Sequence, residues 1–184
     1  MAAKLSLGAG GQPVSNGNEQ REVAEGLKQA LRRLAKAVAI VTASEGELRL
    51  AMCATAVCEV SLDPPSMLVC VNRSASLYPL LARGVSFAIN ILDVSQANIA
   101  TCCGGAVKGE ARFQVGSWYG SEKGVPLLAG AQACIMCDLD RKIDYGTHGI
   151  FIGKVLGVVL SGQPDPLVYV DGRYTRVKLD SPDA

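Results

Sequence analysis

One histidine, seven cysteines and a short run of small residues bear most on the chemistry of this sequence. His148 is the single histidine of 184 residues, and no nucleophile motif stands near it in "DYGTHGIF". A Ser-His-Asp or Cys-His site needs a nucleophile placed beside the imidazole. No GxGxxG follows a strand and no P-loop is present. An enzyme with so few grouped acids, bases and nucleophiles would take its chemistry from a cofactor, although a binding module without activity would look the same.

The cysteines predict free thiols, not a disulfide framework or a metal centre. Their number is odd, and the start "MAAKLSLGAGG" lacks the long apolar stretch of a signal peptide. This pattern favours a reduced, cytoplasmic protein. The one metal-like spacing is Cys134-Ile-Met-Cys137, but a structural zinc needs four ligands and no second pair accompanies this one. We therefore expect no metal, and in a strand these two thiols would point to opposite faces.

The segment "MCATAVCEVSLDPP", residues 52–65, uses Ala, Thr and Cys where a core strand normally takes Val, Ile and Leu. Two interpretations are open. Either the strand packs tightly against its own protein, or something flat lies against it. Pro64 and Pro65 fix a bend after Asp63, so the end of the segment is structural.

The loop "NRSAS", residues 72–76, places polar side chains directly after an apolar strand. Its Asn and Ser side chains can donate hydrogen bonds to phosphate oxygens, and Arg73 can pair with a phosphate. The alternative is that Asn and Ser cap the helix that follows.

The elements that must position these residues are mainly strands. Segments rich in Val and Ile and bounded by turn residues predict strands at 37–43, 50–60, 66–72, 85–92, 132–140, 149–160 and 166–170. A helical period runs from Glu19 to Val38, and short helices fit near 76–83 and 95–103. Many strands with few helices favour an antiparallel barrel over repeated βαβ units. We predict one domain over residues 19–178, with flexible tails at 1–18 and 179–184.

The composition limits the kinds of partner that the chain is expected to bind. Hydrophobic residues make up 49% of the chain and charged residues 19%, and the net charge is +1. This balance gives no basic patch of the kind nucleic acid requires, and no apolar run is long enough to span a membrane. The high apolar content predicts that part of the surface is buried in a homodimer.

Three stretches together resemble a known family: "MCATAVCEVSLDPPSMLVCVNRSAS", "FAINIL" and "YGTHGIFIGKV". They are similar to the short-chain flavin reductases, which are the reductase components of two-component flavin monooxygenases of the 4-hydroxyphenylacetate 3-monooxygenase type. The resemblance extends from about Leu27 to Val177. It implies a split β-barrel of Greek-key type with a few flanking helices, and a homodimer that binds FMN or FAD near the subunit interface. NADH or NADPH would bind over the flavin, and reduced flavin would diffuse to a separate oxygenase.

The resemblance also implies roles for individual residues. Those expected to contact flavin or nicotinamide are Met52, Cys53, Ala54, Thr55, Asn72, Arg73, Ser74, Ser76, Cys103, Lys108, His148 and Tyr174. His148 would orient the nicotinamide and Tyr174 would cover it, while hydride transfer itself requires no protein base. Lys108 and Arg112 could meet phosphate or be solvated, and Trp118 is expected to be a packing residue.

Departures from the family pattern keep alternatives open. Cys53 stands where Thr or Ser is usual, Glu59 where Ser is common, and Ala51 where Gly is frequent. A thiol is a weaker hydrogen-bond donor than a hydroxyl, so the flavin affinity and the choice between FMN and FAD stay open. One alternative is a flavin-binding barrel for storage, delivery or sensing. The other is an enzyme that reduces a corrinoid or ferric iron through tightly held flavin.

Overall fold

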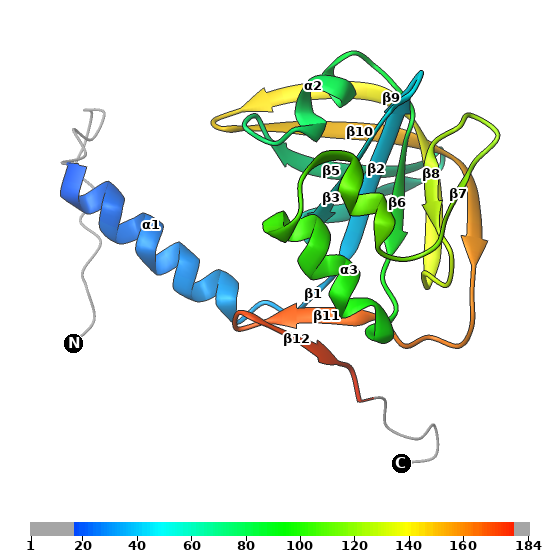
Figure 1. The fold of residues 1–184 in the computed structure, drawn as a ribbon. Helices are drawn as coiled ribbons and strands as arrows, with labels where there is room; N and C mark the ends of the chain where they lie inside the picture. Colours follow the sequence, from blue (N-terminus) through cyan, green and yellow to red (C-terminus); the bar gives the residue numbers. More distant parts are fainter. Residues whose placement is uncertain (1–16, 179–184) are drawn as a thin grey trace. The chain divides into compact units, whose positions relative to one another are not determined.

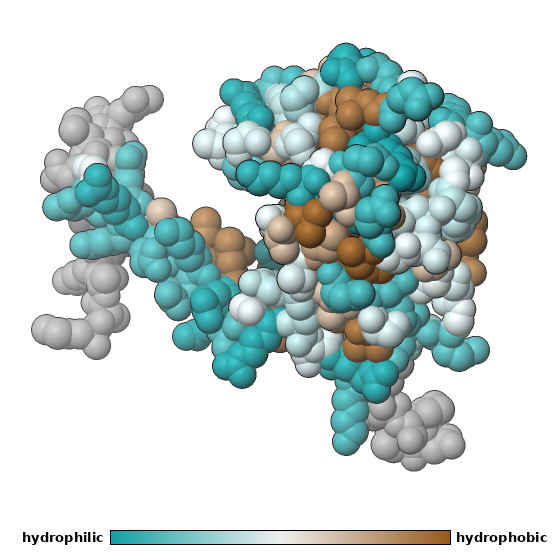
Figure 2. Space-filling view, in the orientation of Figure 1, coloured by the Kyte–Doolittle hydropathy of each residue, from teal (hydrophilic) through white to brown (hydrophobic). Residues whose placement is uncertain are grey.

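The computed structural model describes residues 17–178, and the predicted tails lie outside them except for Gly17 and Asn18. Of these, residues 17–34 belong to a different compact unit from residues 35–178, so the predicted single domain stays a prediction. Within the described residues that unit contains helix α1 (Gly17–Arg32), which buries none of its side chains. Its apolar side chains gather along one side, as Figure 2 shows, and Val23 and Leu27 are more than half exposed. The helical period predicted as far as Val38 is wrong beyond Arg32.

Val38 belongs to the β-structure instead. Its backbone N–H donates to the carbonyl of Leu167 at 3.0 Å, and its carbonyl accepts from Leu92 N–H at 2.9 Å. Its side chain is fully buried. A buried β-branched residue with both backbone groups paired to strand neighbours extends the sheet, and its spacing from Leu34 was coincidental.

The chain from Lys36 onward forms three antiparallel sheets (Figure 1). Seven strands build the large sheet, in the order β3 (Leu48–Ala54), β2 (Ala39–Glu45), β6 (Phe87–Ile91), β9 (Ala133–Tyr145), β10 (His148–Leu160), β5 (Pro65–Asn72) and β4 (Val57–Leu62). A smaller sheet has the order β1 (Lys36–Ala37), β11 (Leu167–Val170) and β12 (Arg173–Arg176). The third is the hairpin of β7 (Trp118–Gly120) and β8 (Pro126–Leu128). The predicted mainly β class is confirmed.

The order of the large sheet shows that it curls. Its two edge strands, β3 and β4, follow each other in the sequence and are separated only by Thr55 and Ala56. A sheet whose first and last strands are joined by two residues must bring its edges together at that end. We call the junction at Thr55 and Ala56 the seam.

The concave side of the sheet holds one hydrophobic cluster. Phe87 and Phe151 are fully buried there, and helix α2 (Leu77–Ala82) adds three leucines, Leu77, Leu80 and Leu81. Since strand side chains alternate between faces, these positions mark the inward face of β5, β6 and β10.

A second cluster covers the outer face of β2, β3 and β6. It is built by α3 (Ala97–Thr101), by the helical turns η1 (Val94–Gln96), η2 (Cys102–Ala106) and η3 (Gly109–Gln114), and by β7 and β8. Two buried polar side chains fix this layer, because Thr42 Oγ1 donates to the carbonyl of Pro126 at 2.6 Å and Asn90 Oδ1 accepts from Leu128 N–H at 2.9 Å. Cys134 lies in this cluster and Cys137 in the inner one, so the two thiols point to opposite faces as predicted.

The outer face of β10, β5 and β4 is different, because much of its apolar surface is exposed. Strand alternation places Leu68, Ile150 and Ile152 on this face, and all three are only partly buried. At the ends of the same strands Leu62 is 88% and Leu160 is 76% exposed. An apolar sheet face of this kind is typical of an interaction surface.

Candidate functional site

The seam is one reason for the small residues at positions 53–56. The predicted strand 50–60 is in fact two strands, because the chain passes from one edge of the sheet to the other at Thr55 and Ala56. The carbonyl of Ala56 accepts from Cys70 N–H at 2.9 Å, so the crossing lies beside the end of β5. Where two sheet edges converge, large side chains such as those of Ile and Leu would collide, whereas small residues let the backbones approach.

A pocket of about 230 Å³ opens at the seam. Six residues line it: Cys53, Ala54, Thr55, Gly104, Tyr169 and Tyr174. The two tyrosine rings lie 5.5 Å apart between centroids and are tilted by 60°. The pocket therefore has a floor of small residues and a wall of two aromatic rings.

Tyr174 and Cys53, two of the residues that line this seam pocket, are neutral at physiological pH. Burial raises the pKa of Tyr174 to about 12, with a further contribution from the nearby Cys53 thiol. Burial likewise raises the pKa of Cys53, against the smaller effect of its contact with Tyr174. Uncharged small and aromatic groups suit a flat, largely uncharged ring.

The loop of residues 72–76 lies at the same end of the sheet. Asn72 Oδ1 accepts from Ser74 N–H at 2.9 Å and from Ser74 Oγ at 2.8 Å, which folds the loop into a turn. Arg73 N–H donates to the carbonyl of Thr147 at 2.9 Å. Ser76 occupies the position before α2, but its side chain makes no capping hydrogen bond. The alternative of a helix-capping serine is therefore not seen.

His148 begins β10 directly opposite Asn72, to which it is paired in register. The imidazole is exposed, and its Nδ1 lies 2.9 Å from Thr147 Oγ1. Register thus brings the histidine, the polar loop and the seam to one end of the curled sheet, although His148 does not line the seam pocket itself.

Three further predicted residues are not among those that line the seam pocket. Met52 packs toward the inner cluster, on the opposite face from Cys53. Cys103 is buried next to Cys53, and burial raises its pKa to about 12, so it is an unreactive thiol. Lys108 is exposed and precedes η3. Their roles stay predictions.

The choice left open for Arg112 is decided by its contacts. Its Nε donates to the carbonyl of Val107 at 2.7 Å, and Nη1 donates to the carbonyl of Ala51. These bonds tie the segment around η2 to β3, so Arg112 has a structural role. Trp118 packs edge-on against Phe113 at 5.1 Å and donates to the carbonyl of Val115, which makes it a packing residue as expected.

Gly104 and Tyr169 line the seam pocket but were missed in the sequence. Gly104 lies in "CCGG", where only Cys103 was singled out, and Tyr169 stood in a predicted strand with no polar neighbour to single it out. The pairing of β11 with β12 is the missing information, because it places Tyr169 opposite Tyr174.

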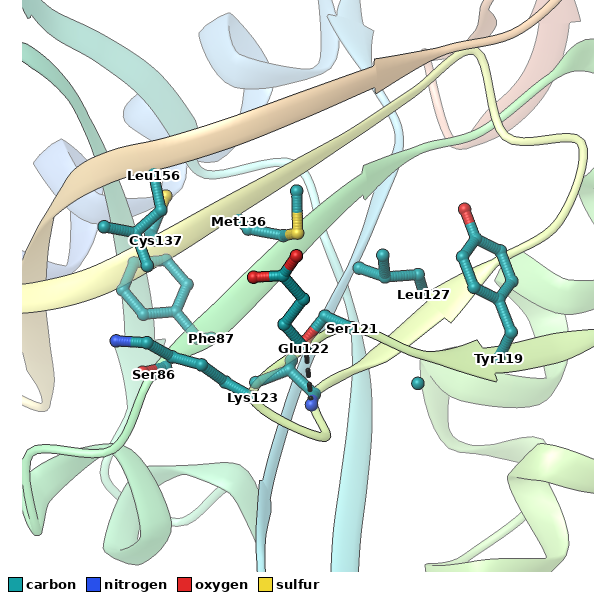
Figure 3. A pocket seen from close by; sticks show the side chains of 12 residues that line it. Ser86, Phe87, Tyr119, Ser121, Glu122, Lys123, Leu127, Met136, Cys137 and Leu156 are labelled. Carbon is teal, nitrogen blue, oxygen red and sulfur yellow. Dashed lines mark hydrogen bonds between the residues drawn. The ribbon is translucent and has the colours of Figure 1, made fainter.

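A separate hollow of about 360 Å³ lies between the β7–β8 hairpin and β6, β9 and β10 (Figure 3). Phe87, Leu127 and Met136 are among its lining residues. Lys123 reaches Asp138 at 2.6 Å and, together with Ser86, lowers the pKa of that carboxyl group. None of the predicted site residues lines this hollow.

Residues 17–178 contain no cluster of three or more His, Cys, Asp or Glu side chains that could hold a metal ion. None of the helices among them is long and apolar enough to cross a membrane.

Comparison with protein families shows which family the chain belongs to. A model of the flavin reductase like domain matches residues 31–178. The chain belongs to this family. The flavin reductase resemblance drawn from the sequence is therefore confirmed, and the matched region contains the seam, the polar loop and His148.

Individual flavin reductases cover most of the chain. The FMN reductase (NADH) RutF of Stutzerimonas stutzeri (strain A1501) is 36% identical over 152 residues, which are 83% of this chain and 87% of the relative. The reductase component of the FADH(2)-dependent resorcinol hydroxylase of Rhizobium sp. (strain MTP-10005) is 36% identical over 154 residues, 83% of this chain and 86% of the relative.

A solved flavin reductase has the same fold. The NADH:FAD oxidoreductase SgcE6 of Streptomyces globisporus C-1027, in complex with NAD and FAD fragments, superposes with a TM-score of 0.77 at 26% identity. The match covers 94% of this chain and 99% of that one. The predicted split-barrel fold is confirmed.

The residues at the seam fit a flavin. The family implies a planar isoalloxazine ring, and small side chains at Ala54 and Thr55 let backbone groups approach such a ring. Gly104 has no side chain to obstruct it, and a Cβ added there would contact only the Cβ of Cys53, at 3.9 Å. The pocket lining therefore supports the second interpretation of the opening segment, in which something flat lies against it.

Proposed function

We propose that this flavin reductase oxidises NADH, reduces FMN or FAD, and releases the reduced flavin to a separate oxygenase. The observation that carries the proposal is the seam pocket, where small residues and two tyrosine rings lie at the same end of the sheet as the polar loop 72–76. A ring site next to a phosphate-binding loop is what a flavin mononucleotide requires.

The chain's own residues would bind the flavin and orient it. Bound flavin accepts a hydride from the nicotinamide, which needs no protein acid or base. Ala54 and Thr55 would hold the ring through backbone groups, and Arg73 and Ser74 would hold the phosphate. Holding two reactants in a reactive geometry is itself a large source of rate enhancement.

The names of the relatives bear on the hydride donor and on the recipient of the reduced flavin. NADH is named for RutF and for SgcE6, so we propose NADH over NADPH. The resorcinol hydroxylase relative is named as a reductase component, which supports an oxygenase as the recipient of reduced flavin. All seven cysteines are free, which supports the cytoplasm as the place of action.

We also propose a homodimer formed through the outer face of β10, β5 and β4. The partly exposed Leu68, Ile150 and Ile152 lie on this face, with Leu62 at its edge. Obligate dimer interfaces are apolar in this way. The loop 72–76 begins where β5 ends and His148 begins β10, so a second copy on this face would lie close to the site.

The function is tested by an anaerobic titration of the purified protein with FMN and FAD, followed by NADH. We expect flavin to bind, its absorbance to bleach on addition of NADH, and the reduced flavin to pass a filter that retains the protein. Sedimentation of the same sample should give a dimer. Flavin that binds and is never reduced would favour the storage or sensing alternative, and flavin that is reduced but retained would favour a non-flavin acceptor.

His148→Ala should raise the KM for NADH and leave the KM for flavin nearly unchanged. The imidazole is exposed at the site, and loss of one hydrogen bond to a ligand corresponds to about three- to tenfold in affinity. Steady-state NADH oxidation at varied NADH and varied FMN separates the two constants. His148→Asn, which keeps a donor, is the matched control and should retain part of the affinity. Equal effects on both constants would refute a nicotinamide role.

A further inference from the structure

Asp144, close to the end of β9, gathers a phenol and a cation beside the loop 72–76. Its Oδ1 accepts from the Tyr78 hydroxyl at 2.7 Å, and its Oδ2 lies 3.2 Å from Lys142 Nζ. Lys142 also lies over the Tyr78 ring, 5.2 Å from the centroid. The Tyr78 hydrogen bond, followed by Lys142, lowers the pKa of Asp144. The carboxylate is therefore ionised at neutral pH and held in place by two partners.

Arg73 joins this cluster more loosely. Its Nη2 lies 3.6 Å from Asp144 Oδ1, beyond the roughly 2.7–3.2 Å of an N–H···O hydrogen bond. The two side chains are 49% and 45% exposed, so solvent screens their attraction. The backbone of Arg73, in contrast, is fixed by its bond to the carbonyl of Thr147. The guanidinium is thus anchored at its base and free to turn from Asp144 to a stronger acceptor.

We propose that Asp144 competes with the flavin phosphate for Arg73 and thereby weakens the binding of FMN. This inference rests on the proposed function, which places the phosphate at the loop 72–76. A guanidinium prefers a phosphate that it can engage with two hydrogen bonds, but it must first give up Asp144.

The charges of the cluster also indicate that Asp144 weakens the binding of FMN. Arg73 and Lys142 against Asp144 leave a net charge of +1, and neutralising Asp144 would leave +2. The FMN phosphate carries nearly two negative charges at neutral pH, so the fixed carboxylate repels it as well as occupying Arg73. Weak retention suits an enzyme whose reduced flavin must leave after every turnover.

The test compares FMN with riboflavin, which has the same ring and ribityl chain but no phosphate. Asp144→Asn keeps an oxygen that can accept the Tyr78 hydrogen bond and removes only the charge. We expect the Kd for FMN to fall about two- to fivefold, and the Kd for riboflavin to change by much less than the Kd for FMN. FMN dissociation should slow by a similar factor, because affinity changes at one site act mostly on the off-rate. Quenching of the flavin fluorescence measures the Kd values, and stopped-flow displacement measures the rate of FMN dissociation.

Asp140→Asn is the matched control. Asp140 lies on the same strand and pairs with Lys154 at 2.8 Å and Arg141 at 3.6 Å, away from the loop. It should leave the ratio of the FMN and riboflavin constants unchanged. In an Arg73→Gln background the effect of Asp144→Asn on FMN should shrink.

The outcomes separate the inference from the function on which it rests. Equal changes for both flavins, or weaker FMN binding, would overturn the competition and assign Asp144 a purely structural or supporting role. The same tightening with and without Arg73 would also overturn it. A wild-type protein that binds neither flavin would overturn the proposed function itself, and this inference with it.

Discussion

Gly104→Phe is expected to weaken flavin binding strongly while leaving the fold intact. Gly104 lines the seam pocket, and its backbone is not in the left-handed region that favours glycine. A Cβ there would meet only Cys53 Cβ at 3.9 Å, an ordinary contact. The phenyl ring would therefore enter the space of about 230 Å³ that the flavin ring needs. Forcing two rings into one site costs on the order of 1–3 kcal/mol, so the Kd for FMN should rise by about 10- to 100-fold.

A flavin titration and a thermal melt of the variant measure binding and stability separately. Gly120→Phe is the matched control, because Gly120 also has a single contact at 3.9 Å but lines the hollow beside the β7–β8 hairpin. It should bind flavin like the wild type. Gly104→Ala should also bind well, since a methyl group fits. Wild-type affinity in Gly104→Phe with an unchanged melting temperature would place the flavin elsewhere.

The fold was predictable where local pattern decides it. The strands around Val41, Val69 and Phe151 were found because β-branched and apolar residues bounded by turn residues predict strands. The break at Thr55 and Ala56 was not found, because small residues show neither a turn signal nor a strand period. Only the pairing of β3 with β2, and of β4 with β5, shows that these two residues join opposite edges of one sheet.

The site was predictable only in its parts. The polar loop and His148 were identified as separate motifs, and the flavin came from a family resemblance, not from the physical properties of the residues. Their meeting depends on the pairing of His148 with Asn72, which are 76 positions apart in the chain. The contact of Arg73 with Asp144 and the pair Tyr169 and Tyr174 likewise follow from strand register. Register between distant strands is set by the whole sheet and leaves no local signal.

Gly153 in the "GIFIGKV" stretch is needed for close packing, and Gly153→Val should strongly destabilise the protein. A Cβ at this position would lie 2.7 Å from two ring atoms of Phe87 and 2.8 Å from Cys137 Cβ. Phe87 and Cys137 are fully buried, so neither can easily move away. Overpacking a core costs about 1–3 kcal/mol, and the branched valine should reach the upper end. The Tm should fall by roughly 6–12 °C for a chain of this size.

Gly157→Val is the matched control on the same strand. Its Cβ would meet only the terminal methyl of Met136 at 2.9 Å, and a flexible methionine can turn away. The loss in free energy of unfolding for Gly157→Val should stay below about 1 kcal/mol. Phe87→Leu removes the ring atoms that a Cβ at Gly153 would strike, so Gly153→Ala should cost less in that background than in the wild type. A double-mutant cycle from denaturant unfolding measures this coupling. Additive losses would mean that the strand shifts as a whole, and that Phe87 is not what requires a glycine at position 153.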